Sequence, residues 1–361
     1  MQPAFVLVDD VLFDMHRSDA AHPERPERLH AIRQALSMMS PQLPSETLPA
    51  RDATHDELLR VHTESYMTTL DQAAGLKGHF DADTYYSHDS VAAARRAAGG
   101  AVALCERLVR RDTKLGFALL RPPGHHATSE QAMGFCLLNN AAVAAAHARA
   151  LGLGRVAIVD WDVHHGNGTE EIFYEDPHVL YVSLHQSPCY PGTGAASDVG
   201  SGDGLGYTVN VPLSASADTA VYLAAVERII GPILNQYAPD LLLISAGFDA
   251  HVRDPLAEMK LEDQSYAALF ESLFRALPQR PVGDALLPPG VGVLLEGGYD
   301  LAALAGSFQA TLETAVACSD GRPAAVADEN PRTPPTAPLT RVHEADLERA
   351  QASLRRFWRL D

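Results

Sequence analysis

The feature that most constrains the fold is an alternation of short, continuously apolar segments with longer segments of helical pattern. Segments with the composition of buried strands are 5–8, 117–120, 156–159, 179–184, 207–213, 241–245 and 291–295. Helical patterns are clearest at 26–38, 90–111, 140–151, 217–237, 262–276 and 301–317. Strands that are apolar on both faces and alternate with helices indicate an α/β protein with a mainly parallel sheet between two helical layers. In such folds, function is expected in the loops that follow the carboxyl ends of the strands.

The segment 1–318 shows no break strong enough to divide it, so we expect a single domain there. Two Pro-rich stretches stand out. The first, 277–290, is predicted to be a surface loop before the last strand, and the second, 319–343, an extended linker. A helix is expected after the linker, and the terminal segment 344–361 is expected to dock on the same domain.

The charge balance limits the partners of the protein. The chain has 46 acidic and 28 basic residues, a formal charge of −18, which argues against nucleic acid and favours cationic partners. The four cysteines form no C-x-x-C pair, so a reducing, cytoplasmic location is expected. The N-terminal apolar run contains two aspartates and follows no basic leader, so we expect neither a signal peptide nor a membrane span.

The densest group of reactive side chains follows the apolar run 156–159. Asp160, Asp162 and His164 occupy alternate positions of an extended segment, so their side chains are expected to point to one side. The two aspartates could instead cap the next helix beside a hydrogen-bonded histidine. We favour a metal site, because two carboxylates at the end of a buried strand repel one another unless a cation or donors neutralise them.

A second apolar run, 241–244, ends in small residues and then Asp249. A single aspartate in this place is more often a helix N-cap. Together with Asp162 and His164, however, it completes a set of three nitrogen and oxygen ligands with an open position for water. That pattern is typical of catalytic rather than structural zinc.

Two further segments supply groups for proton transfer and for binding an oxyanion. A stiff Pro-Pro-Gly sequence precedes His125 and His126, which are predicted to transfer protons, with Asp160 orienting one of them. The last strand opens through two glycines into Tyr299, whose phenol could donate to a developing oxyanion. A tyrosine in that place is usually only a packing residue.

Charge arithmetic connects these groups. Two aspartates bound to Zn²⁺ cancel its charge, so a bound water should be less acidic than in a three-histidine site and should need a protein base. A base, a metal and an oxyanion donor together describe metal-dependent amide hydrolysis.

The motifs HPERPERL, PPGHHA, DWDVHHGNG, VSLHQ, YPGTG, NVPL, SAGFDAH and EGGYDL occur in this order between about 5 and 317. Together they resemble the histone deacetylase and acetylpolyamine amidohydrolase family, and most closely its class II-like bacterial members. The resemblance implies the arginase-deacetylase fold, a single three-layer α/β/α domain with a mainly parallel sheet of about eight strands. It assigns 1–318 as the deacetylase catalytic domain.

The resemblance also implies roles for individual residues. One catalytic zinc ion would be bound by Asp162, His164 and Asp249. His125 and His126 match the family's tandem catalytic histidines, and Asp160 matches the carboxylate oriented toward the first of them. Tyr299 matches the transition-state tyrosine. The substrate tunnel, with two facing aromatic side chains and a glycine that allows close approach of an aliphatic stem, matches Gly134, Phe135 and Tyr190.

The family also binds one or two structural potassium ions. Near the zinc, the matching positions are Asp160, Asp162, His164, Ser183 and Leu184. For a remote site they are Phe173, Asp176, Val179 and Tyr207.

The sequence departs from the family pattern at two positions. Asn167 stands where some members carry an aspartate that pairs with the second histidine, so the identity of the principal base is open. Leu256 stands where a polyamine-selective relative has a glutamate, which weakens a polyamine reading, although the negative charge of the chain would attract a polycation. His16 and Thr84 fall in segments that form the tunnel rim in relatives, and both are rim candidates.

The leading hypothesis is a zinc-dependent deacetylase that acts on a small acetylated amine or on an acetyl-lysine peptide or protein. An acetylpolyamine deacetylase is the alternative within the same chemistry, and a homo-oligomer is compatible with either. An arginase-like dimanganese ureohydrolase would need more carboxylates than GFDAH supplies. A catalytically silent acyl-binding or scaffold protein is the alternative from another class, and retention of both histidines, Tyr299 and all three ligands argues against it.

Overall fold

The sheet at the centre of the molecule has eight strands, in the order β2-β1-β5-β12-β9-β6-β7-β8, and every neighbouring pair is parallel. The computed structural model describes residues 3–39, 43–282, 285–322 and 339–360. The strands are β1 (Phe5–Asp9), β2 (Ser45–Pro49), β5 (Leu115–Ala118), β6 (Val156–Asp160), β7 (Val179–Gln186), β8 (Thr208–Leu213), β9 (Leu241–Ala246) and β12 (Gly290–Leu295). The predicted mainly parallel sheet of about eight strands is therefore confirmed.

Strands β5, β12, β9 and β6 in the middle of the sheet are buried along their whole length, whereas β2 alternates exposed and half-buried residues. That pattern suits an edge strand with one neighbour, and it explains why a search for continuously apolar runs missed β2.

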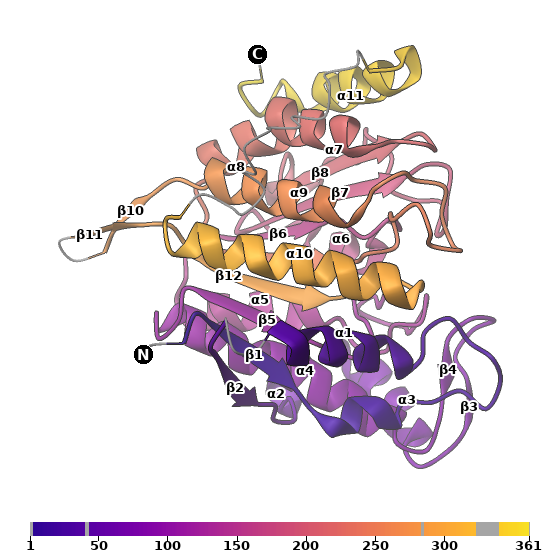
Figure 1. Ribbon diagram of the computed structural model, residues 1–361. Coiled ribbons are helices and arrows are strands. Elements are labelled where there is room, and N and C mark those ends of the chain that lie inside the picture. The colour runs from indigo at the N-terminus through magenta and orange to yellow at the C-terminus, as the bar shows by residue number, and fades with distance from the viewer. Residues whose placement is uncertain (1–2, 40–42, 283–284, 323–338, 361) are drawn as a thin grey trace.

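Helices cover both faces of the sheet. One layer contains α1 (Glu27–Met39), α10 (Leu301–Ser319), α9 (Asp263–Ala276), α8 (Gly231–Tyr237) and α7 (Thr219–Ala225). Helix α10 contacts α1 and α9, α9 also contacts α7 and α8, and Figure 1 shows α1, α10 and α9 side by side across the near face. A short π-helical segment, Val226–Ile230, joins α7 to α8. The other layer contains α4 (Ser90–Val109) and α5 (Asn140–Ala150), flanked by α2 (His55–Leu58), α3 (Glu64–Ala73) and α6 (Asn167–Phe173). The three-layer prediction is confirmed.

The sequence predicts a surface loop for the Pro-rich segment 277–290, and the structure shows more than a loop there. It contains β10 (Arg280–Val282) and β11 (Ala285–Leu287), which pair in antiparallel fashion, with residues 283–284 outside the described residues. Short apolar runs on both sides of a Gly-Asp pair are a hairpin signal in the sequence, which the proline content outweighed in the prediction. A second antiparallel pair, β3 (Gly78–His79) with β4 (Tyr85–Tyr86), lies outside the main sheet.

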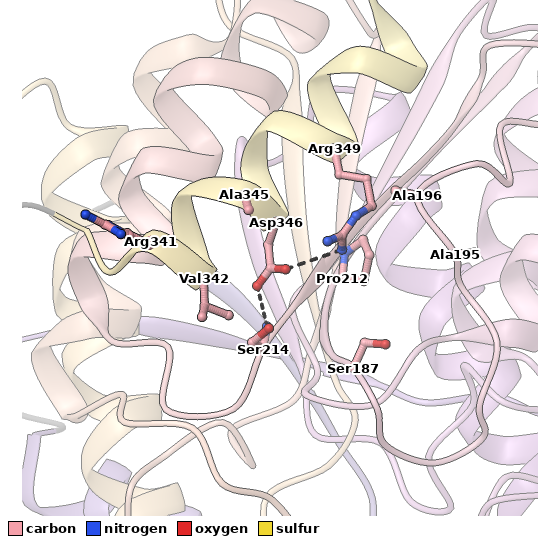
Figure 2. A pocket seen from close by; sticks show the side chains of 10 residues that line it. All are labelled: Ser187, Ala195, Ala196, Pro212, Ser214, Arg341, Val342, Ala345, Asp346 and Arg349. Atoms are coloured by element: carbon pink, nitrogen blue, oxygen red, sulfur yellow. Dashed lines mark hydrogen bonds and ion pairs between the residues drawn. The ribbon is translucent and has the colours of Figure 1, made fainter.

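The C-terminal helix α11 (Arg341–Leu354) lies against β8, at the opposite edge of the sheet from β2. Leu347, Ala350 and Leu354 on this helix are buried. Beside α11 the surface is hollowed by a pocket of about 540 Å³, where Asp346 accepts a hydrogen bond from the backbone of Ser214 and pairs with Arg349 (Figure 2). Of the predicted linker 319–343, residues 323–338 lie outside the described residues.

Helix α10 is long and apolar enough to cross a membrane by length and composition alone, but more than half of its most apolar stretch is buried inside the molecule. It packs between α1 and α9. Burial on several sides explains its apolar character, as expected for a core helix.

The strand order decides where function can lie. Strands β5, β12, β9 and β6 are consecutive in the sheet and parallel, so their carboxyl ends meet at one edge. The residues predicted to be catalytic or to bind zinc lie in the loops that follow these strands, except Asp160, which is the last residue of β6.

Candidate active site

Three of the predicted ligands converge at this edge. The Nδ1 atom of His164 lies 3.2 Å from Oδ1 of Asp162 and 3.2 Å from Oδ2 of Asp249, and all three side chains are buried. Backbone bonds fix the carboxylates, since the N–H groups of Val163 and His164 donate to Asp249 and Asp162. The three ligand atoms lie within 4.8 Å of one another.

Two glycines make room for these carboxylates. A Cβ atom on Gly297 would lie 2.1 Å from Oδ2 of Asp249, and one on Gly247 would lie 2.1 Å from Oδ2 of Asp162. The backbone N–H of Gly297 also donates to Asp162. Close backbone approach therefore holds two carboxylates face to face in the interior.

The donor set fits a divalent cation. Burial, and next the charge of Asp162, raise the pKa of the Asp249 carboxyl. Buried like charges of this kind are stable only when a cation or protons neutralise them. Two carboxylates and one imidazole are the nitrogen and oxygen ligands that catalytic zinc takes in proteins.

The two histidines are held by different partners. His125 Nδ1 donates to Oδ2 of Asp160 at 3.0 Å, and the fully buried Asp160 also accepts from the hydroxyl of Tyr181. His126 Nδ1 donates to Oδ1 of the neutral Asn167 at 2.8 Å. The two imidazole rings are adjacent, with centroids 4.0 Å apart.

These partners separate the two pKa values. Burial opposes protonation of His125, but Asp160 and Asp162 prevail and raise its pKa to about 10. Burial together with the neighbouring His125 and His164 lowers the pKa of His126 well below its ordinary value. The tandem pair therefore combines a charged and a neutral imidazole.

Tyr299 faces the same space. The backbone N–H of Tyr299 donates to Oδ2 of Asp254 at 2.7 Å, and its ring lies edge-on to Phe135 with centroids 5.8 Å apart. The guanidinium of Arg28 lies 5.1 Å from the centre of the phenol ring. Gly298, with φ of 115°, supplies the turn that aims Tyr299 into the site.

These groups line a cavity of about 500 Å³. Of the predicted residues, it is lined by His126, Gly134, Phe135, His164, Tyr190, Leu256 and Tyr299; the sequence analysis did not anticipate His22, Pro23, Asp83 and Cys189. Leu256 and Tyr190 are more than one-third exposed at the mouth, whereas His164 lies deeper. A Cβ atom on Gly134 would lie 2.4 Å from the ring of His126, which explains a glycine at that point of the wall.

The two rim candidates do not lie at the rim. His16 and Thr84 are both fully buried. Thr84 lies behind the wall, where its hydroxyl oxygen accepts the backbone N–H of Phe135 at 3.1 Å. Position in a rim segment did not reveal which way each side chain points.

The positions matched to potassium form two groups. Asp160 pairs with Ser183 in the β6–β7 register, so the first group, with Asp162, His164 and Leu184, lies at the strand ends beside the carboxylates. The second lies near the amino-terminal ends of β7 and β8 and comprises Phe173, Asp176, Val179 and Tyr207. There the carbonyls of Phe173 and Tyr207 accept backbone N–H groups of Asp176 and Tyr181.

The sequence analysis missed a buried ionic cluster next to the site. Glu24 pairs with Arg121 and, at 3.1 Å, with Arg28, and all three side chains are fully buried. Arg28 also donates to the backbone oxygen of Gly298 at 2.7 Å. Burial opposes ionisation of Glu24, but Arg121 holds the pKa of its carboxyl far below the ordinary range. The HPERPERL motif contains Glu24 and Arg28 and is the signal in the sequence for this cluster, but it supported only the resemblance to the family.

Another group of potential ligands, Glu57, Glu106 and His147, surrounds a cation already. Arg51 donates to both carboxylates, at 2.6 Å to Glu57 and 3.1 Å to Glu106. This group therefore reads as a neutralised ion-pair network and not as a metal site.

Comparison with known proteins agrees with this geometry. A model of the histone deacetylase domain matches residues 22–315. Histone deacetylase 15 of Arabidopsis thaliana is 44% identical over 299 residues, which make up 81% of this chain and about half (52%) of that protein. The histone deacetylase-like amidohydrolase of Pseudomonas aeruginosa is 38% identical over 285 residues, 78% of this chain and 73% of that protein.

Among solved structures, the crystal structure of the HDA15 HD domain matches with a TM-score of 0.87 and 36% sequence identity, and the match covers 99% of this chain and 96% of that one. The resemblance inferred from the motifs is thus confirmed over most of the chain. The protein belongs to the histone deacetylase family and has the arginase-deacetylase fold.

Proposed function

We propose that this protein is a zinc-dependent deacetylase that hydrolyses the amide of acetyl-lysine-like side chains or of acetylated amines. The observation that carries the proposal is that Asp162, His164 and Asp249 form a buried ligand set, and that His164 of this set lines the same cavity as His126 and Tyr299. A metal site, a base and an oxyanion donor in one cavity are the parts that amide hydrolysis requires.

Each group has a role in this proposal. Asp162, His164 and Asp249 would hold the zinc ion, which would supply a Lewis acid and make a water molecule more acidic. His126 is neutral, and its Nδ1 is committed to Asn167, so its Nε2 is the acceptor that faces the cavity and can take a proton from water. His125, charged and paired with Asp160, adds positive charge behind it. The Tyr299 hydroxyl donates to the carbonyl oxygen as negative charge develops on it.

The cavity walls suit an aliphatic amine stem. Phe135 and Tyr190 provide aromatic surface along the cavity, and Gly134 leaves space between them and His126. At the mouth, the exposed Asp83 lines the cavity, and the exposed Asp81 lies two residues before it in the chain. Carboxylates at this place favour substrates that carry further positive charge, as basic peptides and polyamines both do.

The test measures acetate release from an acetyl-lysine peptide by chelator-treated protein, before and after zinc is restored. We expect turnover to return with about one zinc per chain. No turnover with zinc bound would favour the silent acyl-binding alternative, and urea release from arginine with manganese would favour a ureohydrolase. Competition by acetylputrescine and acetylspermidine against the peptide then ranks the substrates.

We also propose that potassium binds at one or both of the two groups of positions that match the family's potassium sites. The thermal midpoint of unfolding should rise in KCl relative to choline chloride at equal ionic strength. An identical midpoint in both salts would contradict a structural potassium site.

A further inference from the structure

A fourth buried carboxylate lies beside the site and has no part in the chemistry just described. Glu296 is the first residue after β12, and its side chain is fully buried. One oxygen, Oε2, accepts the backbone N–H groups of Gly124 at 2.6 Å and His125 at 3.2 Å. The other, Oε1, accepts the hydroxyl of Ser245 at 3.2 Å. Glu296 therefore connects the end of β12 to the turn that carries the tandem histidines.

The strand order explains this position. β12 lies between β5 and β9, so a side chain at its carboxyl end can reach the loops that follow both neighbours. β5 ends at Ala118, and by Gly124 the chain has left the sheet ladder. The N–H groups of this turn consequently need an acceptor from outside the ladder, and Glu296 is the acceptor that the structure gives to two of them.

The rest of the turn is bonded in other directions. The carbonyl of His125 accepts the N–H groups of Gly168 and Thr169, each at 3.1 Å, and the N–H of Ala127 donates to the carbonyl of Gly124. These bonds tie the turn to α6 and close it on itself. Glu296 connects the N–H groups of Gly124 and His125 to the sheet. Removal of its carboxylate would leave these N–H groups without that acceptor, while the carbonyl of His125 would stay bonded to α6.

A carboxylate in this place is costly. Burial and the nearby charge of Asp160 raise the pKa of Glu296 to about 7, although His125 and the N–H of Gly124 act against that rise. Plain packing would be served better by an apolar side chain, which carries no desolvation cost. The three donors that converge on Glu296 give the polar group a specific task.

We propose that Glu296 is a positioning residue of the active site, which holds the turn from Gly124 to His126 so that each imidazole keeps its place against Asp160 or Asn167. The inference rests on the proposed deacetylase function. An imidazole displaced by a fraction of an ångström still occupies the site but accepts and delivers protons less efficiently.

The experiment compares Glu296→Gln, Glu296→Asp and Glu296→Ala with the wild-type enzyme and with Ser245→Ala as a control. Ser245→Ala removes a donor from Oε1 and leaves both backbone bonds in place. Each zinc-loaded variant is assayed for kcat and KM on an acetyl-lysine peptide and for bound zinc. The low-field NMR signal of the His125 Nδ1 proton, which is bonded to Asp160, is recorded for each variant.

Glu296→Asp retains the charge but withdraws the oxygen by one methylene, so kcat should fall about tenfold or more while KM and bound zinc stay near wild type. The kcat of Glu296→Ala should fall at least as far as that of Glu296→Asp. In both variants the signal of the His125 Nδ1 proton should shift or broaden. Glu296→Gln should stay within about threefold of wild type, because its amide oxygen can accept the same two N–H groups. Ser245→Ala should match wild type.

A wild-type kcat and an unshifted proton signal in Glu296→Asp would overturn the inference. So would a Glu296→Gln enzyme as slow as Glu296→Ala, since charge and not hydrogen bonding would then be what matters. If the wild-type protein itself releases no acetate, the proposed function fails, and the proton signal still reports whether Glu296 orients His125.

Discussion

Two buried clusters of charge lie side by side in this protein, and they differ in whether residues of the chain itself pair with their charged groups. In the first, Glu24 faces two guanidinium groups, those of Arg28 and Arg121, and Arg28 also donates to backbone carbonyls. In the second, Asp162 and Asp249 face one another across a single imidazole. The chain's own residues satisfy the first cluster, whereas the like charges of the second are stable only when a cation or protons neutralise them. That difference separates a structural network from a ligand-binding site without reference to any motif.

The comparison is tested most severely by Asp249→Asn. Loss of one of three ligands should abolish stoichiometric zinc binding and lower kcat/KM by about 10³-fold or more, because the Lewis acid contributes several kcal/mol to the transition state. The metal-free variant should be no less stable than metal-free wild type, since an acceptor for the Val163 N–H remains and a like-charge contact disappears. Zinc per chain and urea-unfolding midpoints check both statements. Full zinc occupancy, or a clearly destabilised metal-free variant, would break the contrast.

The matched change in the other cluster is Glu24→Gln. It leaves Arg28 and Arg121 buried without a counter-charge, so the free energy of unfolding should fall by about 3–5 kcal/mol. In the wild-type protein, the free energy of unfolding should also depend on the charge of Glu24, and therefore on pH. The folded pKa of Glu24 lies below its unfolded value of about 4.3, so this stabilisation is present above that pH and is lost as the pH falls below it.

Unfolding midpoints of wild type and Glu24→Gln at pH 7 and pH 3.5 supply the measurement. The difference between the two proteins should narrow at the lower pH. An equal stability at pH 7 would show that the first cluster is not held together by its charges.

Tyr299→Phe separates the two clusters, because the phenol ring lies beside Arg28 of the first and its hydroxyl is proposed to act in the cavity that His164 of the second lines. The ring stays over Arg28, so stability should be unchanged, while loss of the hydroxyl should lower kcat about 10²-fold, as for other oxyanion donors. Bound zinc should remain near one per chain. An unchanged kcat would remove Tyr299 from the chemistry, and a drop in stability would assign it to the structural network instead.

The sequence predicted the second cluster and missed the first for a physical reason. Asp160 ends an apolar strand, and Asp162, His164 and Asp249 follow apolar strands within four residues. Parallel neighbours end at the same edge of the sheet, so their convergence follows from the pattern. Glu24 and Arg28 have the i,i+4 spacing of a local ion pair, but Glu24 and Arg121 are 97 residues apart, and Arg28 also donates to a carbonyl next to Tyr299. No spacing rule connects these last two contacts.

The same logic accounts for the other outcomes. Glu296 lies at the carboxyl end of the apolar strand β12, as Asp160 lies at the carboxyl end of β6, so the same pattern indicates it. The prediction for this segment rested on the glycines and Tyr299 that follow, and it did not include Glu296. The direction of a side chain within a loop is beyond such patterns, as Thr84 shows: its segment was placed at the rim, and its hydroxyl points inward to Phe135.

Thr84 also supplies the smallest expected effect, because its bond belongs to neither charged cluster. Phe135 has φ of 69°, a left-handed conformation that is costly for a bulky residue, and the Thr84 hydroxyl accepts its N–H. Thr84→Val retains the shape and removes that acceptor, a neutral bond that contributes about 1 kcal/mol, so kcat/KM should fall about fivefold, mainly through KM, as the aromatic wall shifts. Thr84→Ser retains the hydroxyl and should stay within about twofold of wild type. A Thr84→Val enzyme that loses as much as Tyr299→Phe would show that neutral contacts in the cavity wall matter as much as the charged groups, and the contrast between the two clusters would then explain less of the activity than their geometry suggests.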